Sequence, residues 1–158
     1  MHSFISFHQN DVTRYSLPSI DANRDWWDAS SRSGTGPLHH MNATRIHFVN
    51  KELSAMHGRD SSKQAQRQLE GLSILDVGCG GGLAAEALAR LGATVTAIDP
   101  ASENIEIAKM HSAGDAATSS IRYLNTTIES IASSDEKFDA VCALEVIGQL
   151  ILFTYCFL

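Results

Sequence analysis

Short apolar runs alternate with amphipathic stretches from residue 73 onward, and this alternation predicts strands separated by helices. Strands are predicted at residues 73–77, 93–98, 121–124 and 138–144, because each run is mostly apolar and is bounded by glycine or by polar residues. Mostly apolar strands that alternate with helices are typical of a parallel sheet covered on both faces. The pattern therefore predicts an α/β fold.

Two helices are predicted between these strands. The first covers residues 83–91 and ends at Gly92. It carries Leu83, Ala87, Leu88 and Leu91 on one face. The second begins at Pro100 and carries Glu103 and Glu106 in its first turns, where the helix dipole favours negative charge. Its inward-facing residues are predicted to be Ile105, Ala108 and His111.

A further helix is predicted upstream, from about Asn42 to Gly58. Its apolar stripe consists of Ile46, Val49, Leu53 and Met56. Residues 59–70 are polar without a clean period and are interpreted as a linker or an exposed helix. Two residue pairs stay open to two interpretations. Trp26 and Trp27 are a hydrophobic lid over the sheet edge or part of a site, and His39 and His40 are surface residues or take part in chemistry.

A glycine-rich turn joins the first predicted strand to the helix that follows it. Gly78, Gly80 and Gly82 alternate in a G-x-G-x-G pattern after Asp76. Glycine is needed where a Cβ would collide with a ligand, or where φ is positive. A dinucleotide-binding fingerprint would require its third glycine at position 83, where Leu83 stands. The spacing therefore argues against a small NAD-binding oxidoreductase.

A second acidic residue closes the next strand. Asp99 follows Gly78 by 21 residues (99 − 78). A carboxylate at this strand end can accept hydrogen bonds from both hydroxyl groups of a ribose. The strand, the glycine turn, the helix and this second acid together predict a cofactor site.

Composition narrows the class of protein. The 158 residues suffice for one domain with a substantial core. The formal net charge of −6 argues against nucleic acid as the main partner, because phosphate binding favours a basic surface. The three cysteines, Cys79, Cys142 and Cys156, contain no C-x-x-C pair. They therefore indicate neither a zinc site nor a disulfide framework, and they favour a reducing compartment.

The two ends of the chain lack the alternating strand and helix pattern of its centre. Residues 1–25 are poorly patterned and mix arginine with aspartate, so they predict neither a clear transit peptide nor a secretory signal. Residues 148–158 form an uncharged hydrophobic tail that is too short to span a bilayer. We therefore divide the chain into these two segments and a domain at 26–147, and we expect no transmembrane span.

Four segments together carry a family resemblance. They are Trp26-Trp27-Asp28, Pro37-Leu38-His39-His40-Met41-Asn42 with Arg45, the run from Leu75 to Leu83, and the run from Gly92 to Asp99. In this combination the domain resembles the ubiquinone-biosynthesis O-methyltransferases, which are class I S-adenosylmethionine-dependent enzymes. The resemblance implies a Rossmann-like sheet and methyl transfer from S-adenosylmethionine to a phenolic hydroxyl of a polyprenyl-dihydroxybenzoate or of demethylubiquinol.

The resemblance also implies a cellular setting and a set of site residues. It implies a mitochondrial protein on the matrix side of the inner membrane, peripheral membrane association and membership of a coenzyme Q biosynthetic complex. Arg45, Gly78, Asp99 and Leu144 match the family's contacts with S-adenosylmethionine, and the glycine motif adds Asp76, Gly80 and Gly82. No residue is assigned as the catalytic base, for which His39 and His40 are candidates.

The sequence departs from the family after the fourth strand. Family members continue there with two glutamates and a histidine that resemble a Mg²⁺ site. This chain keeps Glu145 but has Gly148 and Gln149 at the other two positions. One carboxylate is a poor Mg²⁺ site, because the ion requires near-octahedral oxygen coordination. The predicted magnesium site is therefore incomplete.

The family's later strands find no counterpart in the sequence. We therefore expect an incomplete sheet, the N-terminal half of about four parallel strands in the order 3-2-1-4, with the fourth strand as an apolar edge that the tail covers. Two functional hypotheses follow. One is an O-methyltransferase of ubiquinone biosynthesis. The other is a truncated, catalytically inactive form that at most binds S-adenosylmethionine or a coenzyme Q assembly partner.

Overall fold

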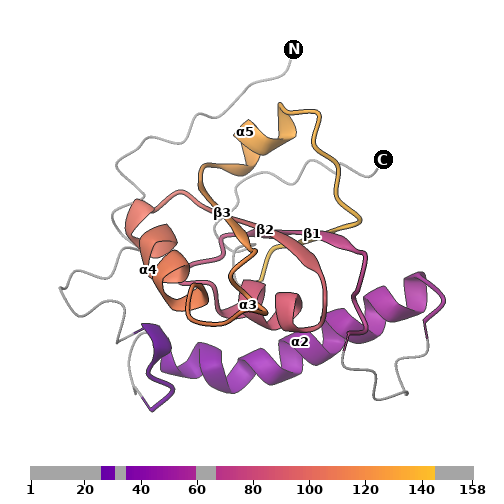
Figure 1. Ribbon diagram of the computed structural model, residues 1–158, viewed down its shortest axis with the longest axis horizontal. Coiled ribbons are helices and arrows are strands. Elements are labelled where there is room, and N and C mark those ends of the chain that lie inside the picture. Colours follow the sequence, from indigo (N-terminus) through magenta and orange to yellow (C-terminus); the bar gives the residue numbers. More distant parts are fainter. Residues whose placement is uncertain (1–25, 31–34, 60–66, 145–158) are drawn as a thin grey trace.

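The computed structural model describes residues 26–30, 35–59 and 67–144 (Figure 1). The expectations for residues 1–25, for Glu145 and for the tail at 148–158 lie outside the described residues. None of the helices in the described part of the chain is long and apolar enough to cross a membrane.

A four-stranded parallel sheet forms the centre of the domain, in the order β3-β2-β1-β4. The strands are β1 (Ser73–Val77), β2 (Thr94–Asp99), β3 (Arg122–Asn125) and β4 (Ala140–Cys142). The α/β class, the parallel sheet and the position of the fourth strand beside the first are confirmed. Among the described residues β4 pairs with β1 alone, and Val141 in β4 is 58% exposed.

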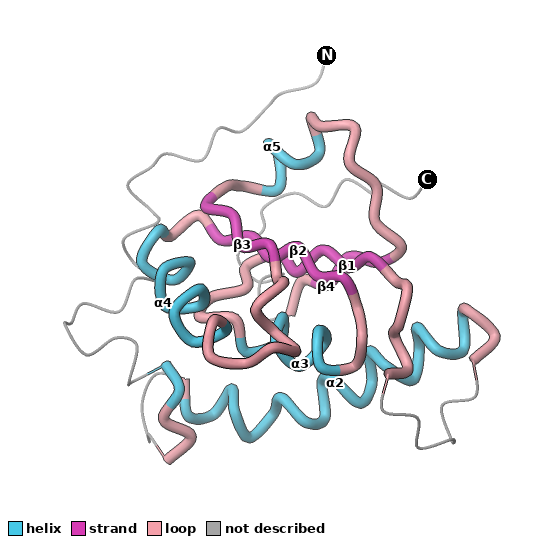
Figure 2. Tube along the Cα trace, in the orientation of Figure 1, coloured by secondary structure: helices cyan, strands magenta, loops and turns pink. Residues whose placement is uncertain are grey.

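Helices cover both faces of the sheet, as predicted. They are α2 (Gly36–Met56), α3 (Leu83–Arg90), α4 (Ser102–Ser112) and the short α5 (Ile128–Ala132). Figure 2 shows α2, α3 and α4 on one side of the strands and α5 on the other. The larger core lies between the first three helices and the sheet, and a smaller one under α5 is centred on Leu75, Val77 and Ile98. The sequence pattern missed α5, because a five-residue helix is too short to establish a helical period.

The predicted apolar face of α3 coincides only in part with its buried face, since Leu88 is buried and Ala87 and Leu91 pack on the core. The residues of α3 that are buried are Ala84, Ala85, Glu86, Leu88 and Ala89. Leu88 is the one member of the predicted face among them, whereas Leu83, Ala87 and Leu91 are half-buried. The reason is packing on two sides, because α3 contacts both the sheet and α2 and therefore presents small alanines to each.

The predicted start of α2 was wrong. The helix begins at Gly36, not Asn42, and Pro37 occupies its first turn, where no backbone N–H is required. His39 and His40 therefore lie on a helix rather than in a loop. Within the predicted stripe, Ile46 and Leu53 are buried and Val49 packs on the core, but Met56 is 73% exposed. Figure 1 shows the last turns of α2 running past the sheet, so Met56 has no core to reach.

The segment that leads into β1 is partly a core element. Leu69 is fully buried, although residues 59–70 were predicted to be a linker or an exposed helix. The guanidinium group of Arg59 donates hydrogen bonds to the carbonyl oxygens of Gln68 (2.6 Å) and Glu70 (2.8 Å). These contacts hold the end of α2 against the start of the sheet.

Candidate functional site

The sheet topology creates one natural place for a ligand. The chain leaves β3 at one edge of the sheet and returns as β4 on the far side of β1. Ligands of open parallel sheets bind at such a switch point, outside the carboxyl ends of the strands. Asp76 near the end of β1, Asp99 at the end of β2 and Leu144 just after β4 all come to this edge. Leu144 is half-buried and packs on the larger core.

The glycine turn follows β1 at this edge. Gly78, Gly80 and Gly82 all have positive φ, at 70°, 54° and 92°. The amides of Gly78 and Cys79 both donate to the carbonyl oxygen of Ile98, at 2.8 and 3.0 Å. The turn is thereby fixed to the end of β2, and its conformation is the one that the glycine pattern predicted.

Asp99 connects the glycine turn to the start of α4. Its carboxylate accepts hydrogen bonds from the Gly80 amide (2.9 Å), the Ala101 amide (2.9 Å) and the side-chain amide of Asn104 (3.2 Å). Asp99 is 7% exposed. An ionised carboxylate offers about four acceptor positions, so these three protein donors leave roughly one for a ligand.

Asn104 is a site residue that the sequence did not reveal. It is 5% exposed, and its carbonyl oxygen Oδ1 is buried without a hydrogen-bond partner among the described residues. A polar residue in the first turns of a helix ordinarily faces solvent, so Asn104 could not be singled out from the sequence. The unused acceptor beside Asp99 is the kind of group that a ligand donor satisfies.

Asp76 is almost fully buried beneath the turn, at 2% exposed. Burial raises the pKa of its carboxyl group to about 7, and nearby Asp99 acts in the same direction. The positive charge of Arg45 and a hydrogen bond from the Ala85 amide in the first turns of α3 lower this pKa in part. Asp76 Oδ2 has no hydrogen-bond partner in the described part of the chain.

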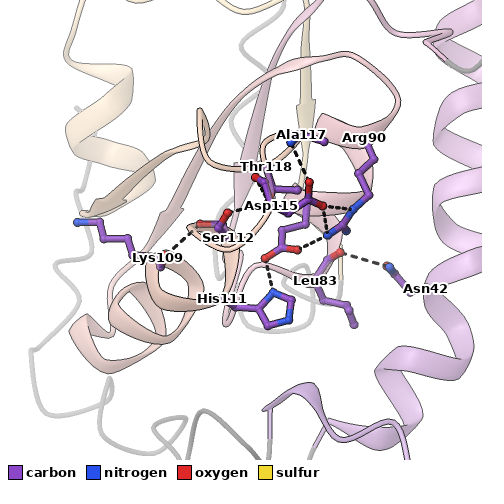
Figure 3. Close-up of polar contacts among 10 residues, drawn as sticks. Asn42, Leu83, Arg90, Lys109, His111, Ser112, Asp115, Ala117 and Thr118 are labelled. Atoms are coloured by element: carbon purple, nitrogen blue, oxygen red, sulfur yellow. Dashed lines mark hydrogen bonds and ion pairs between the residues drawn. The ribbon is translucent and has the colours of Figure 1, made fainter.

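Arg45 reaches this region from α2. Its Nη2 donates to the Leu38 carbonyl oxygen (3.3 Å) and to Asn42 Oδ1 (3.5 Å). Asn42 in turn donates to the carbonyl oxygen of Leu83, at the start of α3 (3.3 Å; Figure 3). The structure therefore brings Arg45 together with Asp76, the three glycines and Asp99.

Trp26 and Trp27 lie at the site rather than over a lateral edge of the sheet. The Trp26 indole lies against the glycine turn, where a Cβ at Gly80 would be only 2.3 Å from its Cη2. The Trp27 indole stacks on the imidazole of His111, with ring centroids 3.4 Å apart and planes 3° apart. Of the two candidate bases, His39 contacts the Trp26 carbonyl oxygen through Nε2 (2.8 Å), and His40 is exposed.

The imidazole of His111 contacts a buried carboxylate, that of Glu86. Glu86 is fully buried on α3, and its two oxygens contact His111 Nδ1 (2.7 Å) and Arg90 Nη2 (2.9 Å). Arg90 also pairs with Asp115 (3.1 Å), and Figure 3 shows Arg90, His111 and Asp115 gathered at this place. The sequence missed this network, since a glutamate in an amphipathic helix ordinarily lies on the solvent side.

The described residues contain no metal-ligand cluster. No three His, Cys, Asp or Glu side chains among them are arranged to hold a metal ion, and Glu145 lies outside the described part. Cys79 and Cys142 are free and buried, and burial raises the pKa of both thiols, that of Cys142 to about 12. They therefore remain protonated near neutral pH.

Sequence comparison identifies the family of this domain. Residues 75–151 match the model of a methyltransferase domain. Over 145 residues the chain is 47% identical to the protein of Arabidopsis thaliana named ubiquinone biosynthesis O-methyltransferase, mitochondrial, covering 92% of this chain and 42% of that protein. Over 122 residues it is 45% identical to the ubiquinone biosynthesis O-methyltransferase of Brucella ovis, covering 77% and 47%. The chain is a homologue of the ubiquinone biosynthesis O-methyltransferases and belongs to their family. The chain spans about half the length of these relatives.

Solved structures support the fold of this family member. The domain resembles magnesium protoporphyrin IX methyltransferase from Synechocystis PCC 6803, a structure with bound S-adenosylmethionine. The TM-score is 0.60 at 19% identity, covering 92% of this chain and 65% of that one. It also resembles the bifunctional kinase-methyltransferase WbdD, with a TM-score of 0.53 at 23% identity over 90% of this chain and 29% of that one. At these identities the likeness shows a common fold.

Proposed function

We propose that this ubiquinone biosynthesis O-methyltransferase homologue transfers a methyl group from S-adenosylmethionine to a phenolic hydroxyl. The observation that carries the proposal is the arrangement of the glycine turn, Asp99 and Asn104 at the switch point of the sheet. The names of the relatives state O-methylation in ubiquinone biosynthesis. As acceptor we propose a polyprenyl-dihydroxybenzoate or demethylubiquinol, which the family resemblance implies.

The described residues fit this cofactor. Three buried polar atoms at the site have no hydrogen-bond partner among them, namely Trp26 Nε1, Asp76 Oδ2 and Asn104 Oδ1. S-adenosylmethionine carries ribose hydroxyls, an ammonium group, a carboxylate and an adenine, so it offers both donors and acceptors to such atoms. We assign the ribose to Asp99 and Asn104, and the positively charged part of the cofactor to the vicinity of Asp76.

When bound, S-adenosylmethionine supplies an electrophilic methyl group. The contribution of the chain is to fix the glycine turn, through Asp99 and through the Ile98 carbonyl oxygen, so that the bound molecule has one orientation. Fixing two reactants in line is worth several kcal/mol of an activation barrier, of order 7–11 in favourable cases.

The proposal extends to the setting of the reaction. We place the protein in the mitochondrion, on the matrix side of the inner membrane, because the Arabidopsis thaliana relative is named mitochondrial and because a polyprenylated acceptor resides in a membrane. Peripheral association with that membrane and with a coenzyme Q biosynthetic complex belongs to the same proposal.

The reaction can be tested with labelled cofactor. The chain is incubated with S-adenosylmethionine carrying a trideuterated methyl group and with a short-chain prenylated 3,4-dihydroxybenzoate, and mass spectrometry follows the acceptor. We expect an acceptor that is heavier by one CD₃ in place of H, and no product with Asp99→Ala. Binding of the cofactor without any labelled acceptor would contradict catalysis and favour the cofactor-binding alternative.

A further inference from the structure

We propose that Trp26 forms one wall of the cofactor site and that Trp27 holds it there through His111. We call these two residues the tryptophan pair. The inference rests on the proposed function and adds two residues to it, neither of which belongs to the glycine motif or to the acidic residues at the strand ends.

The indole of Trp26 packs directly on the glycine turn. A Cβ built on Gly80 would lie 2.3 Å from Trp26 Cη2, and one built on Gly81 would lie 2.7 Å from Trp26 Cδ2. The indole therefore lies on two consecutive glycines of the turn, both of which are buried. Any side chain at position 80 or 81 would displace it, so the two glycines and Trp26 form one surface.

The backbone of Trp26 is held in this position from α2. Its carbonyl oxygen accepts a hydrogen bond from the hydroxyl of Thr35 (3.0 Å) and lies 2.8 Å from His39 Nε2. Thr35 is buried next to the start of α2. These contacts therefore hold the indole next to α2, the helix on which Arg45 lies.

Trp27 fixes the pair from the opposite side. Its indole is stacked on His111 of α4 and meets His39 edge to face, with centroids 5.8 Å apart. His111 contacts the fully buried carboxylate of Glu86 on α3. Trp27 therefore connects the pair to both helices that border the glycine turn, and its loss should release Trp26.

An unused hydrogen-bond donor indicates that the wall faces a ligand. The Nε1 atoms of Trp26 and Trp27 are both buried and have no acceptor among the described residues. A buried N–H without an acceptor ordinarily costs about 1–3 kcal/mol, so native structures rarely keep one without reason. The carboxylate and the ribose oxygens of S-adenosylmethionine are acceptors of the required kind for Trp26.

The two tryptophans are the only ones in the 158-residue sequence, which makes fluorescence a direct test. Trp27→Phe leaves an aromatic ring that can still stack on His111, so Trp26 stays held and is the one tryptophan of the full chain. This variant is titrated with S-adenosylhomocysteine. We expect the Trp26 emission to change in intensity by at least a fifth, saturating with the binding curve measured by calorimetry. An emission that stays constant while calorimetry records binding would overturn the proposal.

Affinity provides the second readout. We expect Trp26→Ala to weaken binding of S-adenosylhomocysteine by about tenfold or more, and His111→Ala to weaken it several-fold while raising acrylamide quenching of both tryptophans. Phe48→Ala removes an aromatic ring that is 63% exposed on α2 and serves as the matched control, with unchanged affinity. Equal or tighter binding by Trp26→Ala would overturn the proposal, since the indole would then block the site. An unchanged chain that binds no S-adenosylhomocysteine would overturn the proposed function as well.

Discussion

Gly82→Ala is expected to destabilise the domain by about 2–5 kcal/mol. Gly82 has φ of 92°, and its new Cβ would lie 2.6 Å from the Tyr123 hydroxyl and 3.2 Å from Ala108 Cβ. A non-glycine residue in the left-handed region costs about 1–2 kcal/mol, and an added methyl group in a packed core costs about 1–3. Urea unfolding at equilibrium measures the sum, provided that the slope with denaturant is unchanged.

Two variants separate the conformational cost from the steric one. Gly71 has φ of 80° and nothing within 4 Å of its Cβ position, so Gly71→Ala should cost about 1–2 kcal/mol from backbone conformation alone. Tyr123→Phe removes the hydroxyl nearest to the new methyl group, so the cost of Gly82→Ala should fall in that background. Equal losses of stability for Gly82→Ala and Gly71→Ala would show that Gly82 is required for its φ alone.

Asp76 is expected to make the domain less stable as the pH rises from about 4 to about 7. Burial raises the pKa of Asp76 from 3.8 to about 7, so the folded state binds a proton that the unfolded state has already lost in this range. Stability therefore falls with rising pH and levels off above pH 7. The shift of about three pH units corresponds to a change on the order of 4 kcal/mol.

Asp76→Asn isolates this contribution. The amide keeps an acceptor for the Ala85 amide but does not titrate, so the variant should gain stability relative to the unchanged chain as the pH rises from 4 to 7. Asp139→Asn is the opposite control. Hydrogen bonds from the Ser73 amide and hydroxyl lower the pKa of Asp139, so its contribution is lost as the pH falls. Parallel pH profiles for the unchanged chain and Asp76→Asn would contradict the burial of a titrating carboxyl group.

The sheet and its glycine turn could be predicted from the sequence because their signals are local. Each predicted strand is a mostly apolar run. The positive φ of Gly78, Gly80 and Gly82 favours glycine, so the glycine pattern itself predicts the conformation of the turn. Asp99 could be predicted from its place at a strand end. The boundaries of α2 and the buried face of α3 were harder to predict from the sequence, because they depend on the elements that each helix packs against.

The remaining site residues depend on tertiary contacts that leave no local signal. Trp27 and His111 are 84 residues apart (111 − 27) and meet only in the folded chain. Glu86 and Asn104 are polar residues on helices, which ordinarily lie at the surface, yet they are 0% and 5% exposed. Both are buried because a specific partner is present, His111 with Arg90 for Glu86 and Asp99 for Asn104.

Calorimetric titration of the purified chain with S-adenosylhomocysteine tests the central claim most directly. We predict saturable binding at a stoichiometry of about one, and its loss in Asp99→Ala, because the substitution removes the acceptor that orders the Gly80 amide, the Ala101 amide and Asn104. Circular dichroism of the variant establishes that the sheet is still folded. No binding by a folded, unchanged chain, or equal binding by Asp99→Ala, would contradict a cofactor site at this edge of the sheet.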